Sequence, residues 1–216
     1  MRQRIFAVAS LVICPVAFAA TPAVDKTAGS HADIYYQRLD LKAKYQGDSE
    51  SIDGNGGGLA LWLGNGWGLF TAEVETSSLD GNVAGFEVDA DARVWRAGMG
   101  AQFLNTPEGG AWLRAEYVDF NGDLDIEGIG SAGDSQNGFA VHAGGRIGRG
   151  PLNGYAELGI VELDDLDGME YKVGVNYQPG MVGGFVEYRM TDLETDNLGI
   201  DEEWEAIRVG VRIGFQ

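Results

Sequence analysis

The sequence predicts an all-β protein that folds as an up-and-down antiparallel transmembrane β-barrel of about ten strands. Three observations predict this fold. Segments of the chain alternate apolar residues with charged or glycine residues, short and long connections follow one another, and aromatic residues bracket several apolar faces. An alternation with a period of two gives each strand one apolar face and one polar face.

The amino-terminal residues 1–19 are expected to be a secretory signal peptide. Arg2 and Arg4 precede an apolar run over residues 5–18, and Ala17 and Ala19 offer small residues for cleavage. The run is shorter than the roughly 20 residues of a transmembrane helix. Residues 20–31 lack periodicity and are expected to form a flexible tail before a barrel of residues 32–216.

The first half of the barrel region contains five segments with the alternation. We predict strands at 33–45, 57–64, 67–77, 87–103 and 110–119. Glycines in residues 64–66 indicate a tight turn, and residues 104–109 form a second short connection, whereas residues 46–56 and 78–86 form longer ones. Val94 and Trp95 are adjacent apolar residues, so the alternation slips by one position and predicts a β-bulge or an early strand start.

The second half contains five more segments, predicted as strands at 138–148, 154–163, 169–178, 182–191 and 204–216. Residues 149–153 and 179–180 connect them tightly, whereas residues 120–137 and 192–203 are longer and acidic, and only residues 164–168 break the order. Such an order predicts short turns at one rim and long loops at the other. Eight strands remain an alternative, because 57–64 and 154–163 are shorter than the roughly 9–11 residues of a spanning strand.

Charged residues stand deep within the strands on the polar face, and we predict that they line the lumen. An arginine or lysine facing lipid at the midplane would cost about 2–4 kcal/mol, whereas opposite charges can pair inside a narrow barrel. Glycines on the same face, such as Gly159 and Gly174, are expected to make room for neighbouring side chains. The predicted lumenal network consists of Arg38, Asp40, Lys42, Glu73, Glu75, Asp89, Asp91, Arg93, Arg96, Arg114, Glu116, His142, Glu170, Lys172, Glu187, Arg189, Arg208 and Arg212.

Aromatic residues flank aliphatic residues on several apolar faces, which is typical of the girdles at two membrane interfaces. The predicted girdle consists of Tyr35, Tyr45, Trp95, Phe103, Tyr171, Tyr177 and Phe215.

The chain resembles the small bacterial outer-membrane β-barrel proteins, the group that includes the transmembrane domain of outer-membrane protein A and its porin-like relatives. The resemblance covers the predicted mature chain, and Val209, Val211, Ile213 and Phe215 near its end resemble the family's terminal assembly signal. It implies location in the bacterial outer membrane, export by the signal peptide and insertion by the barrel-assembly machinery.

Composition limits the chemistry that the chain can perform. The formal net charge of −18 disfavours nucleic-acid binding. His142 on the polar face has no serine nearby on its strand, and we expect it to be hydrogen-bonded to a carboxylate. Residues 119–130 begin like an EF-hand loop but have Leu124 and Gly130 where glycine and glutamate are required. We therefore expect no catalytic residue, no cofactor and no metal site.

The expected function is that of a non-enzymatic outer-membrane barrel with a charge-filled lumen and acidic external loops, in envelope integrity or surface contact. Outer-membrane lipid and lipopolysaccharide are the expected partners, the latter through divalent cations shared with loop carboxylates. A narrow pore for small hydrophilic solutes is the alternative, because a barrel of eight to ten strands has little free lumen. A lipid-modifying barrel enzyme and a soluble lipocalin-like carrier are further alternatives.

Overall fold

The structure is a computed structural model that describes residues 29–45, 48–83, 86–106, 108, 109–126, 128, 130–195 and 200–215. The side chains of residues 44, 45, 48, 49, 82, 83, 195, 200 and 201 are outside this description, as are the predicted signal peptide and nearly all of the predicted tail. Among the described residues, no helix has the length and apolar character of a membrane span.

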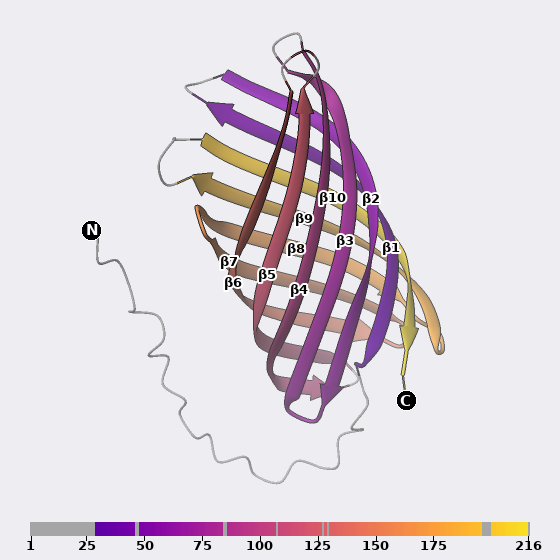
Figure 1. The fold of residues 1–216 in the computed structure, drawn as a ribbon. Helices are drawn as coiled ribbons and strands as arrows, with labels where there is room; N and C mark the ends of the chain where they lie inside the picture. Colours follow the sequence, from indigo (N-terminus) through magenta and orange to yellow (C-terminus); the bar gives the residue numbers. More distant parts are fainter. Residues whose placement is uncertain are drawn as a thin grey trace, which may run out of the picture.

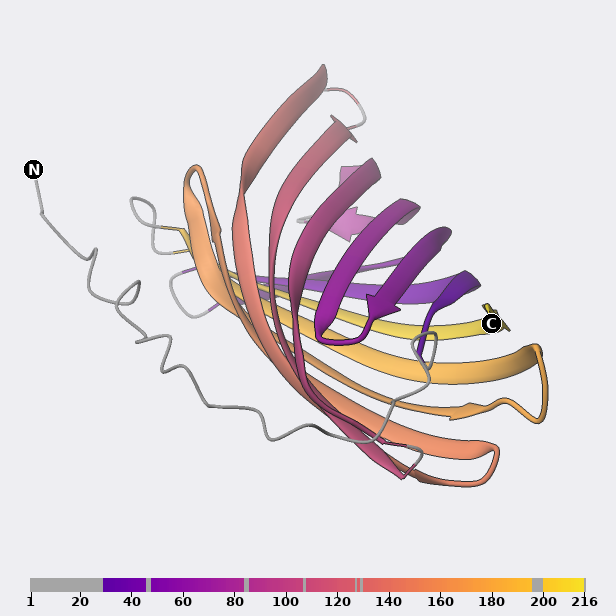
Figure 2. The same ribbon diagram turned by 90° about the horizontal axis from the view of Figure 1, so that it is seen from below.

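Ten antiparallel strands form one closed barrel, which confirms the predicted fold class and strand number. Each strand pairs with its neighbours in the sequence, and β1 pairs with β10 to close the sheet. The strands run obliquely around the barrel axis (Figures 1 and 2). They are β1 (His31–Tyr45), β2 (Asp48–Asn65), β3 (Gly68–Val83), β4 (Phe86–Thr106), β5 (Gly109–Ile126), β6 (Gly130–Arg149), β7 (Leu152–Leu163), β8 (Leu166–Tyr177), β9 (Val182–Thr195) and β10 (Ile200–Gly214).

The two ends of the barrel are called the base and the tip. The base is the end where β1 begins and β10 finishes, and it holds the connections at 66–67, 107–108, 150–151 and 178–181. The tip, at the top of Figure 1, holds the other connections. Strands extend through most of the acidic segments that the sequence predicts as long tip loops. Residues 120–137, for example, contain the end of β5 and the start of β6, so that only 127–129 lie between them.

The polarity of the two faces reverses along each strand. On β10, Arg208 points inward and Val209 points outward with 52% of its surface exposed, whereas nearer the tip Ala206 is buried inside and Glu205 lies outside. The same change occurs on β5 between Glu116 and Val118. The basal half is therefore polar inside and apolar outside, and the half at the tip is apolar inside and polar outside.

This reversal explains the slip in the alternation at Val94 and Trp95. The pairing of β4 with β3 and β5 is unbroken there, so the predicted β-bulge is wrong at this point. Val94 lines the apolar interior near the tip, while Trp95 is exposed on the apolar outer band. The register shift in β4 lies nearer the base, between Gln102 and Leu104.

The interior of the tip half is lined by apolar side chains. Val118, Ala140, Val161 and Leu193 form a buried cluster on four strands, and Val94, Leu163 and Leu166 pack against it. Phe120 and Trp204 meet edge to face toward the tip with ring centroids 5.7 Å apart. Apolar side chains thus line the interior between the charged basal half and the tip.

Candidate functional site: the lumen

A layer of charged side chains crosses the middle of the barrel. Arg208 on β10 donates to Glu73 at 2.7 Å and to Glu187 at 3.2 Å, and it also binds Glu75. Arg189 on β9 binds Glu170 on β8 and reaches Glu75 on β3 at 3.3 Å. Glu187 and Glu170 lie on strands next to their partners, whereas Glu73 and Glu75 lie on β3, which is not adjacent to β9 or β10, so their contacts with Arg208 and Arg189 cross the lumen.

The layer continues on the opposite wall around Arg114 of β5. Its guanidinium donates to both carboxylate oxygens of Glu157, at 3.1 and 2.5 Å, and contacts Glu116. Lys172 lies 3.1 Å from Glu170 and 3.6 Å from Glu157. Paired buried charges of this kind are costly to separate, because the remaining partner would stay in a poorly hydrated interior. We call the whole set the charge layer: Glu73, Glu75, Arg96, Arg114, Glu116, His142, Glu157, Glu170, Lys172, Glu187, Arg189 and Arg208.

His142 lies completely buried in the charge layer. Its Nε2 is 3.2 Å from Glu170 and its Nδ1 is 3.5 Å from Glu116, but neither nitrogen has hydrogen-bond geometry within the described part of the chain. The expected carboxylates therefore lie close to the ring, but the expected hydrogen bond is not formed among the described residues. A Cβ at Gly159 on the next strand would overlap the imidazole ring, so this glycine makes the space that the histidine occupies.

Twelve of the predicted lumenal residues point inward, in or next to the charge layer: Glu73, Glu75, Arg96, Arg114, Glu116, His142, Glu170, Lys172, Glu187, Arg189, Arg208 and Arg212. Arg212 lies toward the base, where it makes two hydrogen bonds to Asp33 at 2.8 and 2.7 Å.

The prediction is wrong for six others, Arg38, Asp40, Lys42, Asp89, Asp91 and Arg93, which lie on the outer face of the tip half. There the apolar residues of the same strands, such as Leu39 and Val88, fill the interior instead. The prediction that charges face inward assumed an apolar outer face along the whole strand. Near the tip the outer face is polar, so the assumption does not hold there.

The predicted aromatic girdle is partly different in the structure. Trp95, Phe103, Tyr171, Tyr177 and Phe215 are exposed on the outside, and the side chain of Tyr45 is outside the described residues. The prediction is wrong for Tyr35, which points inward, is 6% exposed and donates to Glu73 at 2.7 Å. A Cβ at Gly58, the partner of Tyr35 on the neighbouring strand β2, would overlap the Tyr35 ring, so this glycine was the sequence signal for it.

Sequence reasoning also missed Glu157, Asp33, Tyr155 and Trp112, which all point into the lumen. Glu157 stands two residues before Gly159 on the same face of β7. Because Gly159 was predicted to face the lumen, this spacing could have placed Glu157 in the lumen as well. Tyr155 fills the space left by Gly174 on the next strand and donates to Glu187 at 2.8 Å.

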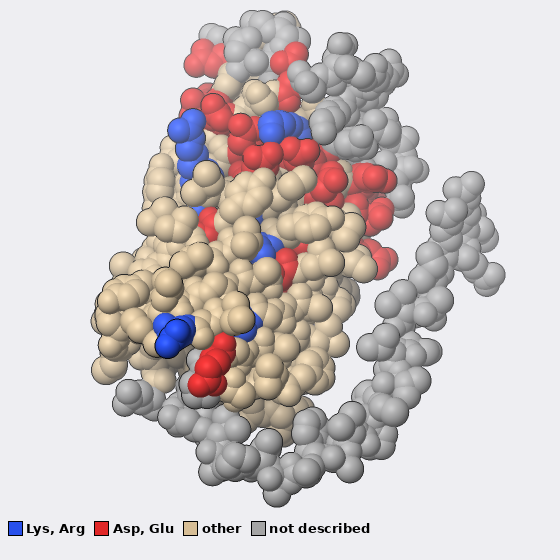
Figure 3. Space-filling view, turned by 180° about the vertical axis from the view of Figure 1, so that it is seen from behind, with Lys and Arg blue, Asp and Glu red and all other residues tan. Residues whose placement is uncertain are grey.

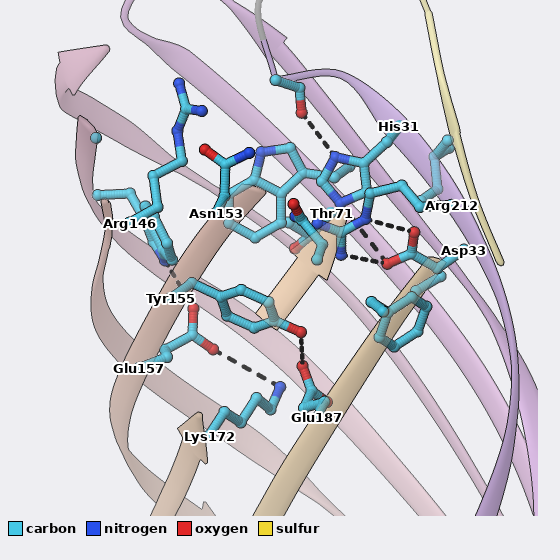
Figure 4. A pocket seen from close by; sticks show the side chains of 18 of the residues that line it. His31, Asp33, Thr71, Arg146, Asn153, Tyr155, Glu157, Lys172, Glu187 and Arg212 are labelled. Carbon is cyan, nitrogen blue, oxygen red and sulfur yellow. Dashed lines mark hydrogen bonds and ion pairs between the residues drawn. The ribbon is translucent and has the colours of Figure 1, made fainter. Parts of the chain in front are cut away.

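The charge layer separates two cavities. The basal cavity is about 250 Å³ and is lined by polar, charged and aromatic residues. Figure 4 shows Thr71, Asn153 and Tyr155 in it, between Arg146 on one side and the Asp33–Arg212 pair on the other. The second cavity, on the tip side, is about 90 Å³ and has mostly apolar walls. Arg208 borders both cavities, so the layer there is about one side chain thick.

Donor atoms of His142, Glu157 and Glu170 lie within 4.8 Å of one another, a spacing that could suit a metal ion. Both carboxylates, however, already bind cationic side chains, Arg114 and Lys172 at Glu157, and Arg189 and Lys172 at Glu170. A metal ion would therefore enter among existing positive charges. We assign no metal to this cluster.

The outer surface of the tip half is acidic. Figure 3 shows aspartates and glutamates gathered toward the tip and a band with few charges below them. Lys42 is one of the few cations there. It donates to Glu205 at 2.9 Å and to Glu203 at 3.3 Å, and these bonds raise the pKa of Lys42 above its usual range.

No protein-family model and no curated protein matches the sequence. Solved structures that are similar include Ail, the attachment invasion locus protein of Yersinia pestis, with 11% identity, 85% of this chain and 99% of the other covered, and a TM-score of 0.43. Neisserial surface protein A is similar with 11% identity, coverage of 85% and 97%, and a TM-score of 0.43. An outer membrane channel from Pseudomonas putida F1 is similar with 12% identity, coverage of 90% and 100%, and a TM-score of 0.45. At these values, function has to be argued from the residues of this chain.

Proposed function

We propose that this chain is a non-enzymatic integral outer-membrane barrel with a closed lumen, whose tip half stands outside the membrane as an acidic surface. Its role is structural, in envelope integrity or contact with the surroundings. The reversal of face polarity carries this proposal. A soluble barrel would expose its apolar belt to water while burying charges inside, which is unfavourable. Lipid around the basal half and water around the tip half match the polarity of both outer surfaces.

The proposal is tested by measuring the surroundings of two outward positions on β10. Spin labels at Val209→Cys and Glu205→Cys, in the full chain folded into lipid vesicles, report contact with dissolved oxygen or with a water-soluble nickel complex. We expect Val209 to be accessible to oxygen and Glu205 to the nickel complex. Equal accessibility to the nickel complex at both positions, or recovery of the protein from periplasm without detergent, would contradict membrane insertion and favour a soluble carrier.

Acidic residues on the outer tip surface support lipopolysaccharide as a partner through shared divalent cations, because both surfaces are anionic. The test compares thermal denaturation in intact outer membranes with and without a chelator. A lower transition temperature with the chelator is expected, and an unchanged one would remove this partner from the proposal.

A narrow pore is the second candidate, favoured by the two cavities that approach each other at Arg208. Planar-bilayer recordings separate the two candidates. We expect the native protein to give no channel steps, since the charge layer fills the lumen, and reproducible steps would favour the pore.

A further inference from the structure

The basal cavity has features of a ligand site that the closed-barrel role does not require. It lies between the charge layer and the basal rim, and its lining includes Asn105 and Gln178 next to the basal turns. It therefore extends to the end of the barrel. Its volume of about 250 Å³ lies just below the range for ligand pockets, roughly 300–1,000 Å³.

Two buried polar atoms in this lining have no hydrogen-bond partner within the described residues. They are Oγ1 of Thr71 on β3 and Oδ1 of Asn176 on β8, in residues that are 6% and 8% exposed. Leaving a buried polar atom unpaired costs about 1–3 kcal/mol, so each atom favours a hydrogen-bond partner inside the cavity, either a water molecule or a group of a ligand. The two residues come from strands separated by four others on either side of the barrel, and both border the same cavity.

The charged residues around the cavity indicate the charge of a group that would bind there. The carboxylates in the lining are paired with arginine or lysine, as in Asp33–Arg212 and Glu157–Arg114. Arg146 on β6 differs: it donates to Asn105 Oδ1 at 2.9 Å and to the Thr106 carbonyl at 3.0 Å, and no ion pair joins it to a described carboxylate. A guanidinium with only neutral partners is a ready partner for an anionic group.

Aromatic rings supply the apolar part of the cavity wall. Trp62 on β2 and Trp112 on β5 meet edge to face with ring centroids 5.3 Å apart, and both border the cavity together with Tyr155. Aromatic faces pack well against the C–H faces of a sugar ring, while amides and hydroxyls bind its hydroxyl groups. Asn153, next to Asn176 in the register of β7 and β8, adds a second amide to the same wall.

The geometry points to a binding site in the basal cavity for a small polyhydroxylated anion, a sugar acid of monosaccharide size. Its carboxylate binds Arg146, its ring packs against the aromatic wall, and its hydroxyl groups satisfy Thr71 and Asn176. The site is independent of whether the tip half contacts lipopolysaccharide and of whether the lumen conducts.

The test is calorimetric titration of the full chain, folded in detergent, with three probes at constant ionic strength: glucuronate, glucose and acetate. We expect glucuronate to bind saturably with a Kd near or below about 1 mM. Glucose, which lacks the charge, and acetate, which lacks the ring, should each bind at least about tenfold more weakly.

Variants connect the binding to the proposed residues. Arg146→Gln should weaken glucuronate binding about tenfold and leave glucose unchanged. Thr71→Val, close to isosteric, should weaken both sugars. Arg149→Gln is the matched control, because Arg149 is an exposed arginine on the same strand and does not line the cavity. Heat-modifiable gel migration confirms that each variant is folded.

Three results would overturn the proposal: no saturable binding of glucuronate, equal binding of acetate, or binding that neither Arg146→Gln nor Thr71→Val reduces. The spin-label experiment on β10 does not depend on these results, so failure of the sugar site and failure of the membrane proposal are distinguishable.

Discussion

Glu170 on β8 lies 3.0 Å from Nη1 of Arg96 on β4, so two strands four positions apart in the sheet meet across the lumen. Arg189, Lys172 and His142 approach the same carboxylate. Glu170 thus balances several positive groups at the centre of the charge layer.

Glu170→Gln should destabilise the barrel by about 3–5 kcal/mol, because Arg96, Arg189 and Lys172 would stay buried without this charge. Urea unfolding in lipid vesicles measures the loss. Glu162→Gln is the control, since Glu162 lies exposed on the outer face of β7 and should change stability by less than about 0.5 kcal/mol. Similar losses in both variants would show that the charge layer contributes nothing specific.

Opening the charge layer at its thinnest point should create a channel. The double variant Arg208→Ala and Glu75→Ala removes one positive and one negative side chain, and Arg208 borders both cavities. We expect channel steps in planar bilayers where the native protein gives none. The outward pair Arg38→Ala and Asp91→Ala removes the same charges from the outer face and should leave the barrel closed. A silent Arg208 variant would mean that the apolar core near the tip also closes the lumen.

Gly159→Ala should destabilise the barrel by about 1–3 kcal/mol, since its Cβ would overlap the buried ring of His142. Adding His142→Ser should recover part of the loss by freeing that space. Gly180→Ala is the matched control, because no atom lies within 4 Å of a Cβ placed there. The transition in urea measures all three variants, and a loss in Gly159→Ala that His142→Ser does not reduce would contradict the overlap.

The apolar interior near the tip should reject charge although the basal lumen accepts it. Val118→Asp places a carboxylate among Ala140, Val161 and Leu193, and we expect a loss of about 4 kcal/mol or more. Asp119→Asn, at the next residue on the outside, should be nearly neutral. Refolding yield and urea unfolding measure the difference, and a tolerated Val118→Asp would mean that water fills this part of the barrel.

The strand pattern could be predicted from the sequence because alternation is a local property. Ile207, Val209 and Val211 alternate with arginine and glycine whatever the rest of the chain does, and the ten segments appear as β1 to β10. Inward glycines were also readable, since a strand gains little from glycine unless a neighbour needs its space. Gly159 and Gly174 indeed face His142 and Tyr155.

Which face of each strand points into the lumen could not be predicted in the same way. Arg38 and Arg208 both alternate with apolar residues, yet Arg208 points into the lumen and Arg38 points out. Arg38 pairs with Ile207, the neighbour of Arg208, so the two arginines stand at nearly the same level but on opposite faces of the sheet. Which face points into the lumen follows from how the strands pair and close, and this joins residues far apart in the sequence.

The sequence by itself determined an antiparallel barrel of about ten strands, with eight still open, because a period of two and the glycine-rich turns act within a few residues. Only the tertiary structure decided which charges meet. Arg208 with Glu75, and Arg96 with Glu170, are brought together by closure of the sheet and by the tilt of its strands. Closure also created the basal cavity, where Arg146, Thr71 and Asn176 come from three strands to border one space.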